Sequence, residues 1–291
     1  MIRYTNKQFK IVIATLCVLL SSAACNPNSD SSSTNGKASS AQPAASFTGE
    51  AFQHAVITDT LAYGEVDDLN VKGHFAFPED KIGATPAIIL VHEWWGLNDD
   101  MRLLANQFAA EGFIVLAVDL FGGKTASGPG EARKLMLGVF EHPDFAEQNL
   151  QQARNWVLNI AGASQVAVVG YGFGGGWSLN AAIALPDQFD AAVIFYGLVS
   201  DNEELLAAID MPVLGFFGGV DKTIPVESVR KFDTALENLG KDHEVNIYPG
   251  AKGGFANPGG RNYYQNIAEI SWRRMIEFLN LELVTAKVDV D

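Results

Sequence analysis

From about residue 50 onward, short apolar runs alternate with segments of helical periodicity along this 291-residue chain. Six runs have the length and composition of buried strands, and they span residues 87–91, 113–118, 166–169, 191–195, 213–217 and 245–248. Apolar residues recur at helical spacing in the segments between and after them, at residues 99–111, 145–160, 175–185, 226–239 and 262–279. Two earlier segments, residues 54–62 and 68–76, have the pattern of an antiparallel pair at the edge of a sheet.

Strands that are apolar on both faces and separated by helices indicate a parallel sheet covered on both sides. The pattern therefore predicts an α/β fold, with a mainly parallel twisted sheet of about eight strands and helices on both faces. The sequence shows no internal repeat. We expect one domain over residues 47–291, since α/β folds of this size are commonly single units.

The N-terminus has the organisation of an export signal over residues 1–24. Three basic residues, Arg3, Lys7 and Lys10, and no acidic one precede an apolar run at residues 11–20, and the small residues Ser21-Ser22-Ala23-Ala24 follow it. This run is too short to span a bilayer as a permanent helix. Cys25 follows directly and resembles the lipidated cysteine of a bacterial lipoprotein; ordinary cleavage after Ala24 is the alternative.

Residues 25–46 are rich in Ser, Asn, Ala, Gly and Pro and predict a flexible tether. We expect an exported protein, either periplasmic or anchored as a lipoprotein. Membrane attachment is expected only through a lipid on Cys25.

The charge balance limits the partners, because 34 acidic and 20 basic residues give a formal net charge of −14. Such a chain is poorly suited to nucleic acid, whose binding depends on neutralising phosphates, or to anionic lipid. Both cysteines, Cys17 and Cys25, lie in the N-terminal segment. The predicted domain therefore has no disulfide, no thiolate metal site and no thiol nucleophile.

A glycine-rich turn follows the predicted strand at residues 166–169, in the sequence GYGFGG of residues 170–175. It fits the dinucleotide-binding pattern G-x-G-x-x-G in a strand–turn–helix context. It also fits the nucleophile elbow G-x-S-x-G, with Gly170 and Gly174 as its flanks and Gly172 at the nucleophile position.

The surrounding chain separates these two interpretations. A dinucleotide fold needs an acidic residue near the end of the next strand, but that strand ends in Tyr196-Gly197 and Asp190 lies at its opposite end. A nucleotide-binding oxidoreductase is therefore disfavoured. An elbow needs a loop for an oxyanion after an earlier strand and an acid after a later one. The segment His92–Gly96 and Asp221 occupy these places.

Several motifs together resemble the dienelactone hydrolase family over about residues 50–283. They are HEWWGL (92–97), AVDLFGG (117–123), the elbow followed by WSL (177–179), AAVIFYG (191–197), Asp221 with Ile224-Pro225, YPGA (248–251) and GFAN (254–257). The resemblance implies an α/β-hydrolase fold. It also implies hydrolysis of lactones and carboxylic esters by a Cys (or Ser), His and Asp triad, without metal or other cofactor.

The resemblance assigns a role to individual positions. Asp221 is the triad acid, Gly172 stands at the nucleophile position, Gly253 stands at the histidine position, and Glu93 is the glutamate that controls the nucleophile's proton. The N–H groups of Trp94 and Phe173 would form the oxyanion hole, and Trp95 and Tyr196 would line the pocket. His92 is interpreted as a residue that makes local hydrogen bonds, and Ser178 as helix packing.

Glycine at positions 172 and 253 supplies neither a nucleophile nor a base, although acyl transfer by this route needs both. We therefore predict a dienelactone-hydrolase-like protein that is inactive or very weak and that binds a small lactone or ester-like ligand. Two alternatives stay open: hydrolysis by a non-standard route, and an altered form of an active Cys–His–Asp enzyme.

Overall fold

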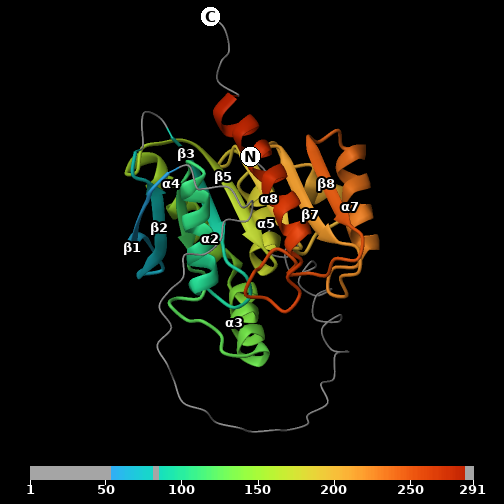
Figure 1. Ribbon diagram of the computed structural model, residues 1–291, viewed down its shortest axis with the longest axis horizontal. Coiled ribbons are helices and arrows are strands. Elements are labelled where there is room, and N and C mark those ends of the chain that lie inside the picture. Colours follow the sequence, from blue (N-terminus) through green and yellow to red (C-terminus); the bar gives the residue numbers. More distant parts are fainter. Residues whose placement is uncertain (1–53, 81–84, 286–291) are drawn as a thin grey trace, which may run out of the picture. The chain divides into compact units, whose positions relative to one another are not determined.

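The computed structural model describes residues 54–80 and 85–285, so the predicted export signal, tether and Cys25 lie outside the described residues. Eight strands form one sheet in the order β1-β2-β4-β3-β5-β6-β7-β8 (Figure 1). They are β1 (Val56–Val66), β2 (Leu69–Pro78), β3 (Thr85–Val91), β4 (Ile114–Val118), β5 (Ala163–Tyr171), β6 (Ala191–Phe195), β7 (Val213–Gly218) and β8 (His243–Tyr248). Strand β2 pairs antiparallel with β1 and β4, and all other pairs are parallel. The predicted mainly parallel sheet, with an antiparallel pair at its edge, is confirmed.

Helices connect the strands and cover both faces of the sheet (Figure 1). They are α2 (Asp99–Ala110), α3 (Pro129–Glu141), α4 (Pro143–Asn159), α5 (Phe173–Ala184), α6 (Glu203–Leu206), α7 (Val226–Asn238) and α8 (Gln265–Asn280), continued by the π-helix η2 (Leu281–Thr285). Helices α2 and α8 pack into one core cluster with the sheet, and α4, α5 and α7 contribute no residue to that cluster. None of the helices in the described part of the chain is long and apolar enough to cross a membrane.

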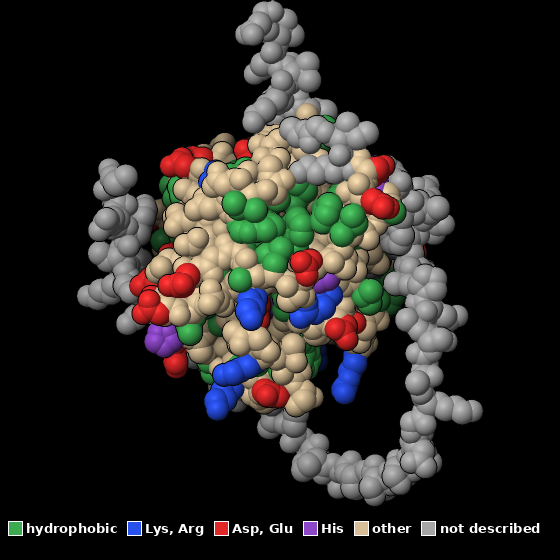
Figure 2. Space-filling view, turned by 90° about the vertical axis from the view of Figure 1, so that its left-hand side faces the viewer, with side chains coloured by type: hydrophobic (Ala, Val, Ile, Leu, Met, Phe, Trp, Pro, Cys, Tyr) green, Lys and Arg blue, Asp and Glu red, His purple; other side chains and the backbone are tan. Residues whose placement is uncertain are grey.

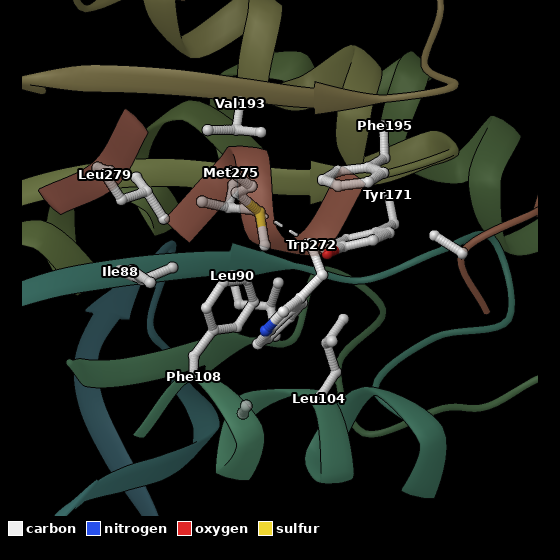
Figure 3. Close-up of a cluster of buried hydrophobic side chains, with 14 of the residues drawn as sticks. Ile88, Leu90, Leu104, Phe108, Tyr171, Val193, Phe195, Trp272, Met275 and Leu279 are labelled. Carbon is white, nitrogen blue, oxygen red and sulfur yellow. Dashed lines mark hydrogen bonds between the residues drawn. The ribbon is translucent and has the colours of Figure 1, made fainter. Parts of the chain in front are cut away.

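The main core lies between the sheet and the pair α2 and α8 (Figure 3). Here the ring of Phe108 in α2 packs 4.6 Å from the ring of Trp272 in α8. Tyr171, the last residue of β5, stacks on Phe195 of β6 with ring centroids 4.3 Å apart. Its hydroxyl lies 4.0 Å from the sulfur of Met275. Packing of these large buried side chains fixes the ends of β5, which leads into the glycine-rich turn, and of β6, which leads into Tyr196.

Acidic side chains are spread over the side of the molecule shown in Figure 2, whereas most of the lysine and arginine side chains visible there lie in its lower half. This is the side that carries the exposed edge strand β1, as a comparison with Figure 1 shows. On this side of the molecule the basic side chains are therefore less evenly distributed than the acidic ones. Net charge acts on solubility and long-range steering rather than on the fold.

Candidate active site

The predicted site residues come together at one edge of the sheet, because parallel strands all end on the same side. Glu93 follows β3, Gly172 follows β5, Tyr196 follows β6, Asp221 follows β7, and Gly253 lies in the loop after β8. Positions up to 160 residues apart in the sequence therefore lie at this edge of the sheet.

Gly172 forms a sharp turn between β5 and α5, with φ 55° and ψ −110°. Its N–H donates to the carbonyl of Phe195 over 2.8 Å, and its carbonyl accepts from the N–H of Gly176 over 3.2 Å. A side chain would strain this backbone conformation, by about 1–3 kcal/mol. A Cβ atom at this position would nevertheless meet only the ring edge of Tyr196, at 3.9 Å. The turn thus has the backbone of a nucleophile elbow, and there is room for a side chain on it.

The glycines beside the elbow are required by close backbone contacts. A Cβ atom at Gly170 would lie 2.0 Å from the carbonyl oxygen of Gly174, and one at Gly174 would lie 2.2 Å from that of Val91. Real Cβ atoms essentially never approach so closely. The G-x-G-x-G spacing therefore follows from the direct contact of α5 with β3 and β5.

Asp221 and Gly253 lie against each other across the ends of β7 and β8. One carboxylate oxygen of Asp221, Oδ1, accepts the N–H groups of Thr223 at 2.7 Å and Ile224 at 3.3 Å. A Cβ atom at Gly253 would lie 2.4 Å from the other oxygen, Oδ2. Partial burial raises the pKa of Asp221 above its usual range. The Asp221 carboxylate thus occupies the space where a side chain at position 253 would begin.

Glu93 is buried and joins three loops. Its Oε1 accepts the hydroxyl of Tyr196 over 3.0 Å, and its Oε2 accepts the side-chain amide of Asn257 over 2.7 Å. The orientation of that amide is fixed because its oxygen accepts the N–H of Gly259 over 2.9 Å. Burial raises the pKa of Glu93, and hydrogen bonds from Asn257 and Tyr196 oppose the rise.

Comparison with known proteins identifies the type of site. The sequence pattern of the dienelactone hydrolase family matches residues 71–283. The chain belongs to the dienelactone hydrolase family. The resemblance stated from its motifs is confirmed.

Named relatives support this membership over most of their length. The chain is 29% identical over 221 residues to "Protein usf" of Aquifex pyrophilus, covering 74% of this chain and 94% of that protein. It is 27% identical to the "Putative carboxymethylenebutenolidase" of Saccharolobus solfataricus, covering 73% of this chain and 95% of that protein.

Solved structures confirm the α/β-hydrolase fold of this dienelactone hydrolase family member. A dienelactone hydrolase-like promiscuous phosphotriesterase from metagenomic libraries is 22% identical, with a TM-score of 0.71 and coverage of 78% of this chain and 99% of that one. Esterase 2 of the planctomycete Thermogutta terrifontis is 19% identical, with a TM-score of 0.59 and coverage of 80% and 95%. At these identities the likeness supports the fold alone.

Tyr196 has an unusual backbone conformation for a residue with a large side chain. Its φ is 38°, in the left-handed region that favours glycine. Its N–H donates to the carbonyl of Phe216 over 2.7 Å, and its ring packs 5.2 Å from that of Phe255. These contacts and the bond to Glu93 hold Tyr196 in a conformation that is strained by itself. Its predicted role in lining a pocket stays a prediction.

The loop after β3 carries two half-buried tryptophans, Trp94 and Trp95, with ring centroids 4.8 Å apart. The side chain of Phe173 lies in an aromatic cluster, 5.3 Å from the ring of Phe121 and 5.6 Å from that of Phe140 in α3. Because Phe173 is the first residue of α5, its N–H has no acceptor within the helix. The proposed use of the Trp94 and Phe173 amides as an oxyanion hole stays a prediction.

Asn257 lies in the motif GFAN (254–257), but no role was predicted for this residue from the sequence. Its bond to Glu93 joins residues 164 positions apart, and no local pattern gives such a pairing.

The interpretation of His92 was correct: Nδ1 lies 2.7 Å from the carbonyl oxygen of Glu93, and Nε2 accepts the N–H of Leu120 over 3.1 Å. Ser178 is fully buried in α5, consistent with helix packing. Among the described residues, no cluster of three or more His, Cys, Asp or Glu could hold a metal ion.

Replacing Glu93 by Ala should destabilise the fold by about 2–4 kcal/mol, since it leaves the buried donors of Tyr196 and Asn257 without their acceptor. Replacing it by Gln should cost far less. The Gln oxygen can accept from Asn257, and its amide can donate to the Tyr196 hydroxyl oxygen. Urea unfolding of the three proteins measures both effects.

The same series reports the ionisation of Glu93. Its pKa in the fold is raised, so stability is lost as pH rises from the unfolded value of about 4.5 through the folded value. The parent should therefore lose stability relative to Glu93→Gln over a pH interval that begins at about 4.5. A difference that stays constant over this interval would show that Glu93 is ionised throughout.

Proposed function

We propose that this member of the dienelactone hydrolase family binds a small lactone or carboxylic ester and hydrolyses it very slowly or not at all. One observation carries the proposal. The turn at Gly172 has the backbone of an elbow and Asp221 lies against Gly253, while neither Gly172 nor Gly253, the two positions that would carry the reacting groups, has a side chain. Membership of the family supports the substrate class.

The proposed chemistry is limited by what these residues supply. The amides of Trp94 and Phe173 would bind the acyl oxygen and stabilise negative charge on it. No side chain at position 172 attacks the carbonyl carbon, so no acyl-enzyme forms there. An oxyanion hole and substrate binding alone leave roughly 10³–10⁴-fold acceleration over water in triad enzymes stripped of triad members.

A weak route through water remains the second candidate function, and one observation favours a particular base for it. Both oxygens of Glu93 already accept hydrogen bonds, from Tyr196 and Asn257. The Oδ1 atom of Asp221 accepts two backbone N–H groups, whereas Oδ2 faces the position where a histidine side chain would begin. Asp221 Oδ2 is therefore the better group to orient a water.

The direct test is binding and hydrolysis by the purified parent chain, with a dienelactone and an activated aryl ester. We expect ligand-detected NMR to report binding of the lactone, and hydrolysis to be slow. Asp221→Ala is the matched variant, because it removes the favoured base without touching the proposed oxyanion donors. Fast turnover by the parent that Asp221→Ala abolishes would replace the weak-binder proposal with the carboxylate-and-water route. Absence of binding would remove the proposed ligand class.

A further inference from the structure

The imidazole of His92 is buried directly behind the loop that carries Trp94, and its protonation state follows from its partners. The N–H of Leu120 can only donate, so Nε2, 3.1 Å away, must accept. The carbonyl oxygen of Glu93 can only accept, so Nδ1, 2.7 Å away, must carry the proton. His92 is therefore a neutral ring held in one tautomer, with both nitrogens in use.

The carbonyl that His92 holds belongs to the same peptide group as the N–H of Trp94. The described residues contain no cis peptide bonds, so the C=O and N–H of this planar group point in opposite directions. The Glu93 carbonyl also accepts the N–H of Gly96 over 3.1 Å. Because the Glu93 carbonyl is held pointing toward the buried His92 ring, the Trp94 N–H must point away from that ring.

The ring itself has little freedom to move. It packs against Phe121 with centroids 4.6 Å apart and an interplanar angle of 64°, and it stacks on Phe173 at 5.8 Å and 22°. Leu120 and Phe121 belong to the loop after β4, where the Asp119 carboxylate accepts the N–H groups of Phe121 and Gly123. His92 thus links this loop to the peptide before Trp94, and it also touches the side chain of Phe173.

We propose that His92 is a positioning residue that aims the Trp94 N–H at the acyl oxygen of a bound lactone or ester. The inference rests on the proposed function, because it assumes that this amide is an oxyanion donor. The inference goes beyond local hydrogen bonding, because it gives His92 the role of orienting the Trp94 amide, one of the two N–H groups that would stabilise the transition state. His92 does not itself touch the substrate.

Two substitutions separate the two ring nitrogens. His92→Asn places an amide near the position of Nδ1 and can still donate to the Glu93 carbonyl. His92→Gln reaches the position of Nε2, where it can accept from Leu120, and it lacks the donor at Nδ1. Both variants remove the ring from the aromatic cluster, so each controls for the packing loss of the other.

The first readout uses the parent chain and no catalysis. Nitrogen NMR should find His92 protonated at Nδ1 and unprotonated at Nε2. The amide resonance of Trp94 should shift strongly in His92→Gln and much less in His92→Asn. A ring protonated at Nε2, or equal shifts in the two variants, would overturn the proposal.

The second readout uses a chain with Gly172→Cys and Gly253→His as the active background. His92→Gln should lower kcat by about 10–100-fold with little change in KM, part of the 10²–10³-fold cost of losing an oxyanion donor. His92→Asn should retain most of kcat. If kcat falls equally in both variants, and only as much as the fraction of folded protein falls, the role of His92 is structural only. If the folded background shows no hydrolysis, the oxyanion amides are not correctly placed and the proposal for His92 fails, while binding of the lactone by the parent chain still decides the proposed function.

Discussion

Combining Gly172→Cys with Gly253→His should raise hydrolysis of an activated aryl ester by about 10²–10⁴-fold over the parent, the usual contribution of a positioned base acting on a nucleophile. The elbow already has the required backbone, and a Cβ atom at position 172 would meet only the Tyr196 ring, at 3.9 Å. The new histidine would begin beside Asp221, which can hold the imidazole in its catalytic orientation.

The gain should lie toward the lower end of this range, because the Asp221 carboxylate has to move. Its Oδ2 lies 2.4 Å from the Cβ position of residue 253, so it must withdraw to admit a histidine. The Thr223 and Ile224 amides hold Oδ1, and rotation of the carboxylate about that anchor is the easiest response.

The single variants divide the reaction into its steps. Gly172→Cys alone should become acylated by the ester and release the acyl group slowly, which intact-protein mass spectrometry detects. Gly253→His alone should remain at the level of the parent, since it provides a base without a nucleophile. Adding Asp221→Asn to the double variant is the matched control and should remove most of the gain. A folded double variant without activity would mean that the oxyanion amides are not correctly placed.

Gly174→Ala should destabilise the domain by more than about 4 kcal/mol or prevent folding, which places it among the exceptional single substitutions. The new Cβ would lie 2.2 Å from the carbonyl oxygen of Val91 and 2.7 Å from that of His92. Neither obstacle is a side chain that can turn away. Relief of the clash requires α5 to separate from β3, which carries the loop with Glu93 and Trp94.

Gly138→Ala provides the control for a glycine-to-alanine change elsewhere. Gly138 is exposed within α3, and a Cβ there meets no atom within 4 Å. This substitution should stabilise by about 0.5–1 kcal/mol, through helix propensity. Thermal and urea unfolding compare the two variants. Similar stability of Gly174→Ala and the parent would contradict the tight backbone contact between α5 and β3.

The sheet was predictable because its strands are short, continuous apolar runs, such as residues 87–91 and 213–217. Such runs are typical of strands that are buried on both faces, and they lack the periodicity of a helix with one apolar face. Helix α3 was not predicted. Its buried residues Ala132, Met136 and Val139 have helical spacing, but Gly130 and Gly138 lower the local propensity for a helix. Its contact with the site, through Phe140 and Phe173, arises from tertiary packing.

The positions of the candidate site were predictable to the extent that each one follows the end of a strand. Asp221 was named as the acid after a later strand, and Glu93 was named from the resemblance of the surrounding motif to the dienelactone hydrolase family. Their partners were not predictable, because the bond from Asn257 to Glu93 depends on how two distant loops meet. The short distance between the Asp221 carboxylate and residue 253 was not predictable either. It depends on the folded structure, and it is possible only because glycine leaves the space beside the carboxylate empty.

The left-handed φ of Gly172 makes loss and recovery of the nucleophile unequal in evolution. Exchange of a side chain for glycine there releases strain, so the step away from catalysis carries no penalty in folding. The return step costs about 1–3 kcal/mol, a large part of a stability reserve of typically 5–15 kcal/mol. A lineage that had used this reserve for other substitutions could regain a nucleophile at position 172 only after stabilising changes elsewhere.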